Sequence, residues 1–227
     1  MGPSLLGAAL LIARKDLAIE FRTRTAFFSA VVFGVLGAAI FYFAWDPTSV
    51  GALELAPGVL WMIFTFAGLL GLQRSFSTEL ADRAMDGLLV SPVSREAIYM
   101  GKALANLVFV CAVEVVAILA VALFYNMSFS THVPALALFA FLAAVGLVAV
   151  GTLFSAMTVN TRLAELLLPV LSLPFFVPVV IPAAQATAKL LAGRPLAEVA
   201  GWLKVLVAFD IVFVVACTLA FPFTLEE

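Results

Sequence analysis

Residues 103–125 read ALANLVFVCAVEVVAILAVALFY, a stretch whose one charged residue is Glu114. An α-helix rises about 1.5 Å per residue, so about 20 residues cross the roughly 30 Å hydrocarbon core of a bilayer. The stretch is long enough to do this, and its apolar composition is typical of a membrane span. We therefore expect residues 103–125 to form a transmembrane helix.

Similar stretches lie on both sides of this segment. The chain is 65% hydrophobic and 11% charged, whereas a soluble domain is about half apolar and a quarter charged. We therefore expect an all-α, polytopic membrane protein with six transmembrane helices. The expected spans are Ala26–Trp45, Pro57–Leu72 (with a start near Leu53 as an alternative), Ala103–Tyr125, Pro134–Met157, Ala164–Ala184 and Trp202–Thr224.

The basic residues indicate the orientation of these spans. Nine of the twelve Lys and Arg residues would lie on one side: Arg14, Lys15, Arg22, Arg24, Arg74, Arg83, Arg95, Lys102 and Arg162. Because basic residues accumulate on the cytoplasmic side of a membrane, both termini are predicted to be cytoplasmic. The expected location is a bacterial cell (inner) membrane.

Residues 1–25 are predicted to form an amphipathic helix on the cytoplasmic surface, before a six-helix transmembrane domain at 26–227. At 100° per residue, one arc holds Leu10, Ala13, Leu17 and Phe21, and the far side holds Lys15, Asp16 and Arg22. A cytoplasmic extension of the first span is the alternative. Arg14 and Lys15 follow an apolar stretch, the reverse of the order in a secretory signal, so we expect no such signal.

The loop at 73–102 is the longest cytoplasmic segment. Within it, Thr78–Leu89 is predicted to be helical, with Gly87 and Ser91-Pro92 as breaks, and Ser94 is a predicted N-cap for a helix that leads into the third span. The candidate residues for docking a partner are Glu79, Asp82, Arg83, Asp86, Leu88 and Leu89. An ordinary surface loop is the alternative.

Two acids lie within predicted spans, Glu114 in the third and Asp210 in the sixth. An acid in mid-membrane is costly, so each should face the bundle or an aqueous path. The functional interpretation is a polar lining or proton site in a translocation path. An interhelical hydrogen bond is the structural alternative.

The fifth span contains four prolines: Pro169, Pro174, Pro178 and Pro182. Each removes a backbone hydrogen bond and crowds the carbonyl four residues earlier. A movable or broken gating helix is one interpretation, and a static kinked helix is the other. The small residues of the fourth span, from Ala143 to Ser155, are predicted to allow close helix approach.

The sequence lacks the patterns of common catalytic sites. There is no GxxxxGK[ST], HExxH or GxSxG motif, and no basic-aromatic surface for nucleic acid. Cys111 and Cys217 lie in apolar runs, and His132 is the one histidine. We therefore expect neither an enzyme nor a bound metal or cofactor.

Several stretches, in order, resemble a known family of membrane proteins. They are Arg14-Lys15-Asp16-Leu17; Leu55-Ala56-Pro57-Gly58-Val59-Leu60-Trp61; Leu72-Gln73-Arg74-Ser75-Phe76; Glu79-Leu80; Asp86-Gly87-Leu88-Leu89; Ser91-Pro92; Gly101-Lys102; and Leu166-Leu167-Leu168-Pro169 through Pro174 to Pro178. The first stretch is similar to many ABC-2-type permeases. Together the stretches resemble the haem exporter B subunit of cytochrome c maturation, CcmB.

The resemblance implies a permease subunit without an ATPase of its own, which serves haem export or the release of haem-loaded chaperone in cytochrome c maturation. ATP and Mg²⁺ would be bound by a CcmA-like ABC ATPase, and a CcmC-like membrane protein and a CcmE-like haem chaperone would be further partners. Two copies are expected in the complex, with the segment around Thr78–Leu89 as the coupling element, and haem as a transported or handled ligand. The alternatives are another ABC-2 exporter, for drugs, lipids or polysaccharide, and a scaffold that relays ATPase motion without transport.

Overall fold

The chain folds into a bundle of long helices, seen here in a computed structural model. The structure describes residues 4–81, 93–127, 133–159, 161 and 163–224, and in these residues it has no strand. The α-helices are α1 (Leu5–Thr23), α2 (Thr25–Ala44), α3 (Ala52–Ala81), α5 (Arg95–Phe124), α6 (Val133–Thr158), α7 (Ala164–Leu191) and α8 (Ala200–Thr224), with a 3₁₀ turn, η1, at Leu196–Glu198.

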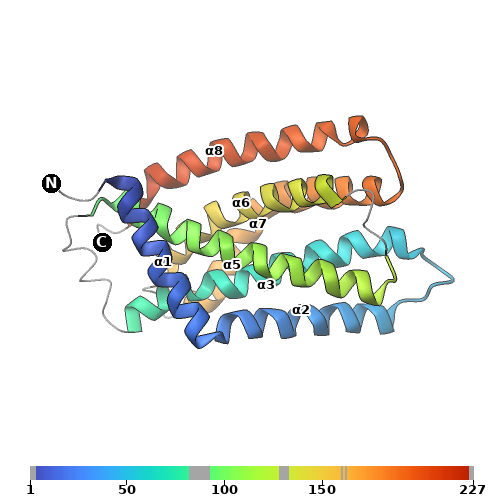
Figure 1. Cartoon of the computed structure of the whole chain (residues 1–227), viewed down its shortest axis with the longest axis horizontal. Coiled ribbons are helices and arrows are strands. Elements are labelled where there is room, and N and C mark those ends of the chain that lie inside the picture. Colours follow the sequence, from blue (N-terminus) through green and yellow to red (C-terminus); the bar gives the residue numbers. More distant parts are fainter. Residues whose placement is uncertain (1–3, 82–92, 128–132, 160, 162, 225–227) are drawn as a thin grey trace.

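Among the described residues, six helices are long and apolar enough to cross a membrane. They are α2, α3, α5, α6, α7 and α8, which confirms the predicted six-span, all-α class. The protein is therefore a multi-pass membrane protein. Figure 1 shows these helices side by side, with the start of α1 and the end of α8 at the same end of the bundle. We call this the basic end, because the helix segments that meet there contain Arg22, Arg24, Arg74, Arg95 and Lys102.

Helices α3 and α6 form the centre of the bundle and have the largest buried shares of the six. The indole of Trp61 on α3 donates to Thr187 Oγ1 on α7 at 3.0 Å, and both side chains are buried. On α6, a Cβ at Gly146 would lie 2.7 Å from Asp210 Oδ1 of α8. The predicted close approach of helices along the small residues of α6 is therefore confirmed.

A tight turn at Arg24 sets α1 across the bundle. Arg24 adopts a left-handed conformation (φ 54°) and its N–H donates to Glu20 O at 2.6 Å, which ends α1. Glu20 Oε1 in turn accepts a hydrogen bond from Phe27 N at 2.9 Å, near the start of α2. Figure 1 shows α1 running obliquely over α5 at the basic end. The predicted surface helix therefore ends at Thr23, not at residue 25.

The faces of α1 differ in part from the prediction. Ala13 lies in the buried face with Ala8, Ala9 and Ile12, whereas Leu10 and Phe21 of the same predicted arc are 59% and 70% exposed. Asp16, predicted on the far side, contacts the bundle, because it follows Ile12 by four residues and so shares its face. Helix α1 therefore has two apolar faces, one packed on the bundle and one exposed, whereas the prediction had a single apolar arc.

Helix boundaries also correct part of the predicted loop at 73–102. Helix α3 is continuous to Ala81, so residues 73–81 belong to it and Thr78 does not begin a separate helix. No Pro or Gly interrupts this stretch, so nothing in its sequence ends the helix. Helix α5 begins at Arg95, with Ser94 accepting from Ala97 N as predicted, so Lys102 lies in a span helix.

Candidate functional site: a lysine-centred network at the basic end

Lys102 of α5 is the centre of a polar network beneath α1. Its side chain is 2% exposed, and its Nζ lies 3.0 Å from Asp16 Oδ2 of α1. The same ammonium donates to Ser75 O of α3 at 2.6 Å and lies 4.9 Å from the centre of the Phe76 ring. Asp16 also contacts Lys15 at 3.1 Å. A buried ammonium is tolerated only with partners of this kind, so the network depends on α1 being docked.

The packing of α1 on α5 brings Asp16 to Lys102. A Cβ at Gly101 would lie 2.7 Å from Ala9 O and 2.7 Å from Ile12 Cβ, so a glycine is needed at this crossing. Asp16 lies one turn beyond Ile12 and Lys102 is next to Gly101, so the close approach sets the length of the ion pair. Gly101 thus allows α1 to pack closely on α5, and Lys102 stabilises that packing through its ion pair with Asp16.

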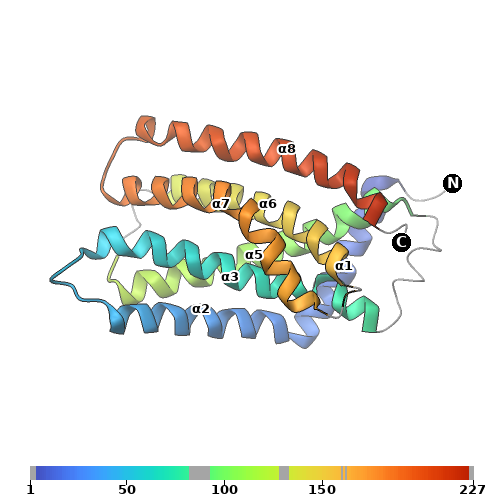
Figure 2. The same cartoon turned by 180° about the vertical axis from the view of Figure 1, so that it is seen from behind.

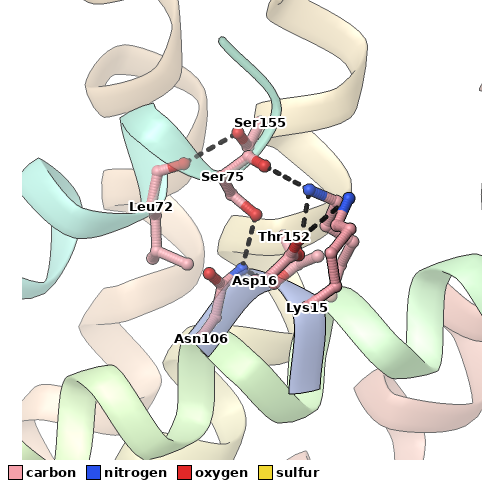
Figure 3. Close-up of polar contacts among 8 residues, drawn as sticks. Lys15, Asp16, Leu72, Ser75, Asn106, Thr152 and Ser155 are labelled. Carbon is pink, nitrogen blue, oxygen red and sulfur yellow. Dashed lines mark hydrogen bonds and ion pairs between the residues drawn. The ribbon is translucent and has the colours of Figure 1, made fainter. Parts of the chain in front are cut away.

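One turn further along α5, Asn106 extends the network to α6. Its amide donates to Ser75 Oγ and to Thr152 Oγ1, each at 2.9 Å. Ser155 of α6 donates to Leu72 O of α3 at 2.8 Å. Figure 3 shows these groups converging from α1, α3, α5 and α6. The network joins four helices with paired polar groups, which favours a single defined arrangement of them.

The end of α8 is held to the same region. Arg95 Nη1 donates to Pro222 O at 3.0 Å, where the last turn of α8 leaves a carbonyl without an intrahelical partner. The Tyr99 hydroxyl donates to Ala149 O of α6 at 3.0 Å. The buried Phe221 ring of α8 lies 5.4 Å from that of Tyr99 and 6.0 Å from that of Phe76. The helices on both sides of residues 82–92 are therefore tied to α1, α6 and α8.

Two cavities flank this network. One, of about 210 Å³, lies between α1, α2, α3 and α5 and is lined by Asp16, Glu20, Arg74, Lys102 and Asn106 among others. The second, of about 500 Å³, lies between α2, α3, α6 and α7. Arg74 and Ala26 line both cavities. Among the residues described, no group of three or more His, Cys, Asp or Glu side chains could hold a metal ion.

Comparison with known proteins assigns a family to this arrangement. The model of the CcmB protein family matches residues 7–227. The chain is 30% identical over 196 residues to "Heme exporter protein B" of Rhodobacter capsulatus, covering 82% of this chain and 87% of the relative. It is 30% identical over 200 residues to "Heme exporter protein B" of Pseudomonas aeruginosa, covering 88% and 89%. The chain belongs to the CcmB family.

Within this CcmB-family protein, the network contains residues that the sequence interpretation did not select. Asp16, Gly101, Lys102 and Asn106 were absent from the predicted site, although two of the stretches that resemble the family contain the first three. A physical signal was present in the sequence. Tyr99, Lys102 and Asn106 recur at spacings of three and four residues, which places polar groups on one face of an otherwise apolar helix.

Most of the predicted docking residues cannot be placed in this structure of the CcmB-family chain. Asp82, Arg83, Asp86, Leu88 and Leu89 lie outside the described residues, and Glu79 is placed only by the backbone of α3. Their role in coupling stays a prediction. His132 also lies outside the described residues.

The two predicted intramembrane acids are both buried, as their positions in spans require. Glu114 of α5 is 5% exposed and Asp210 of α8 is 7% exposed. Neither carboxylate oxygen of Asp210 has a hydrogen-bond partner among the described residues, and Oδ1 faces Gly146 of α6. The structure does not bring either acid into the Lys102 network, and their role in translocation stays a prediction.

The four predicted prolines lie inside α7, which is one continuous helix. Figure 2 shows that α7 bends part-way along its length, as expected where prolines remove backbone hydrogen bonds. Pro174 and Pro178 are exposed whereas Pro182 is buried, so the three prolines spaced by four residues do not share one environment. A gating role for these prolines stays a prediction.

Proposed function

We propose that this protein is the membrane permease subunit of a haem export system, driven by a separate ABC ATPase. The match to the CcmB family over residues 7–227 carries this proposal. The six-span bundle is consistent with it, and the family match and the relatives' printed name favour it over a drug, lipid or polysaccharide permease. The chain itself would not be an enzyme: ATP and Mg²⁺ would be bound by the partner, and haem would be a cargo, not a resident cofactor.

The Lys102 network would carry force from the ATPase into the bundle. A permease without a nucleotide site of its own must receive force through a contact outside the membrane. Residues 82–92 connect α3 and α5, and both helices are held to α1 and α6 by the network. Displacement of this segment would therefore move several helices together. Charged residues such as Asp82 and Asp86 would orient the partner and Leu88 would anchor it.

Co-purification with the ATPase subunit tests this coupling. Charge reversal at Asp82 and Asp86 with Leu88→Ala should abolish capture of the ATPase while the subunit stays inserted and folded. Charge reversal of Asp46, in the exposed turn at the other end of the bundle, is the control and should leave capture unchanged. Normal capture and normal coupling in the first variant would exclude this segment as the transmission element.

Two copies would form the working unit, together with CcmC-like and CcmE-like partners. The exposed prolines of α7 support this pairing. Pro174 cannot donate to Val170 O, and Pro178 cannot donate to Pro174 O, so those carbonyls lose their helical partner. Val170 is 65% exposed, and both prolines are exposed. A carbonyl that lacks this donor is costly in hydrocarbon unless another group binds it, so we expect a partner protein or a water-lined path between copies to cover this face.

The expected location is a bacterial inner membrane with the basic end in the cytoplasm, because basic residues accumulate on that side. A cysteine placed at Thr48, in the turn between α2 and α3, should react with an impermeant thiol reagent added from outside, and one placed at Ser91 should not. The reverse pattern of labelling would overturn the orientation without affecting the family assignment.

A further inference from the structure

Helix α1 has two different stripes on the surface that it turns away from α5. At 100° per residue, four apolar side chains fall within about 60° of one another and form the apolar stripe. Its members are Leu6, Leu10, Leu17 and Phe21, of which the first, second and fourth are 64%, 59% and 70% exposed. Three exposed cations occupy about the next 100° and form the basic stripe. Its members are Arg14, Lys15 and Arg22.

The smaller cavity shows which stripe lies toward the middle of the bundle. Leu17, of the apolar stripe, lines this cavity together with Asn106 and Phe109 of α5. These two residues lie about one and two turns beyond Lys102, away from the basic end. Lys15 lies on the opposite side of α1, because it is about 160° from Leu17 around the helix. The apolar stripe therefore lies toward the membrane-spanning part of the bundle, and the basic stripe lies toward the basic end.

The two acids of α1 are turned toward the bundle, where each has a partner. Asp16 pairs with Lys102 at 3.0 Å, and Glu20 accepts a hydrogen bond from a backbone N–H of α2 at 2.9 Å. Arg14 and Arg22 are exposed, and neither forms a hydrogen bond or an ion pair with a described residue. The outward surface of α1 is therefore positive, which is the charge that complements an acidic membrane surface.

We propose that the two stripes of α1 bind acidic phospholipid in the leaflet at the basic end. Leu10 and Phe21 enter the boundary between headgroups and acyl chains, and Arg14 and Arg22 pair with the negatively charged headgroups. Arginine suits this contact, because its guanidinium binds phosphate oxygens through two N–H groups. Helix α1 also contributes to the Lys102 network, so lipid that holds α1 in place stabilises the network. This proposal does not depend on which molecule the protein transports.

Two neighbouring residues of α1 form a matched pair that tests the orientation. Leu10 and Leu11 are 59% and 63% exposed, but Leu10 belongs to the apolar stripe and Leu11 lies within the arc of the basic stripe. Leu10→Cys and Leu11→Cys are each labelled with bimane in the full chain and placed in nanodiscs. The unsubstituted chain, with its native Cys111 and Cys217, gives the background.

The label at Leu10→Cys should be quenched by brominated acyl chains of phosphatidylcholine. The label at Leu11→Cys should instead be quenched by acrylamide, which is neutral and dissolved in water. Quenching of both labels by acrylamide to the same extent would overturn the proposal, because the apolar stripe would then lie in water.

The preference for acidic lipid is measured at the same Leu10→Cys label. Brominated phosphatidylglycerol competes there with phosphatidylcholine, and the quenching gives their relative binding constant. We expect a preference for phosphatidylglycerol of about fivefold or more, since one arginine near an acidic surface supplies about a fivefold factor. Arg14→Gln with Arg22→Gln should reduce the preference to less than about twofold. Arg194→Gln with Lys204→Gln removes the same charge at the other end of the bundle and should leave the preference unchanged.

A preference below about twofold in the original chain would overturn the selection of acidic lipid. The same conclusion would follow if the preference persisted in the Arg14→Gln, Arg22→Gln variant. Either failure would leave the proposed function in place, because capture of the ATPase tests that function through a different part of the chain.

Discussion

Lys102 and Asp210 are both charged residue types buried in membrane-spanning helices, but their surroundings differ completely. Lys102 contacts the Asp16 carboxylate, the Ser75 carbonyl and the Phe76 ring, which belong to two other helices. Asp210 faces the backbone of Gly146, with no hydrogen-bond partner for its carboxylate among the described residues. The comparison shows that burial alone does not identify a charged residue that stabilises the fold. Such a residue is identified by the number of other helices that its contacts reach.

The largest expected effect is at Lys102. Lys102→Ala leaves Asp16 without its buried partner, and removal of one member of a buried ion pair costs about 3–5 kcal/mol. Because the Asp16 side chain keeps 17% exposure and a contact with Lys15, we expect the lower end of this range. The free energy of unfolding in detergent measures the loss. A loss below about 1 kcal/mol, as for a surface pair, would remove Lys102 from the centre of the network.

The next effect is at Gly101, where α1 crosses α5. Gly101→Ala pushes a methyl group against Ala9 O and Ile12, and overpacking of this kind costs about 1–3 kcal/mol. Gly58→Ala in α3 is the matched control, because a Cβ there meets nothing within 4 Å. It should stabilise the helix by about 0.5–1 kcal/mol. If both variants shift the unfolding midpoint in the same direction, the claim that α1 packs closely on Gly101 is contradicted.

A smaller effect is expected at Asp210, the other member of the comparison. Asp210→Asn removes a charge but no hydrogen bond to a described residue, so the free energy of unfolding should change by less than about 1 kcal/mol. The same measurement as for Lys102 applies. A loss above about 2 kcal/mol would mean that the ionised carboxylate has a partner in the folded protein, and would place Asp210 beside Lys102 as a structural charge.

The smallest effect concerns Asp46, an exposed acid in the turn between α2 and α3. Hydrogen bonds from the Thr48 hydroxyl and then the Thr48 N–H lower the pKa of Asp46 from its ordinary value. Because the folded pKa is lowered, the stabilisation is present above the unfolded pKa and is lost as the pH falls through the folded pKa. Thr48→Ala should raise the pKa of Asp46, measured by NMR titration. An unchanged pKa would show that the hydroxyl contributes nothing.

The spans could be predicted from sequence because length and apolar composition decide them. The N-cap at Ser94 was predictable because its partner, Ala97 N, is only three residues away. The end of α3 was missed, because the polar residues 73–81 resemble a loop although nothing in them breaks a helix. The composition of a stretch indicates whether its residues lie in the membrane, but it does not indicate where a helix ends outside the membrane.

The network at Lys102 could not be predicted from local pattern alone. Lys102 and Asp16 are 86 positions apart in sequence, and their contact depends on the crossing of α1 over Gly101. Counting basic residues placed Lys102 in a loop, although it is buried in α5. The predicted docking residues were chosen by charge and, for Leu88 and Leu89, as apolar anchors, and the intramembrane acids were chosen by charge. The network instead depends on contacts between residues of different helices.

The double variant Asp16→Asn with Lys102→Met tests the central claim most directly. It removes both charges, so neither partner stays buried and unpaired, and folding should survive within about 1–2 kcal/mol of the original protein. Under the proposed function, the measurement is ATP-dependent release of haem-loaded chaperone by a complex reconstituted with the proposed ATPase and CcmE-like partners. The network account predicts that the variant captures the ATPase normally but that release is lost or greatly slowed. Release at the original rate, with the ATPase bound, would contradict the claim that this network couples the ATPase to the bundle.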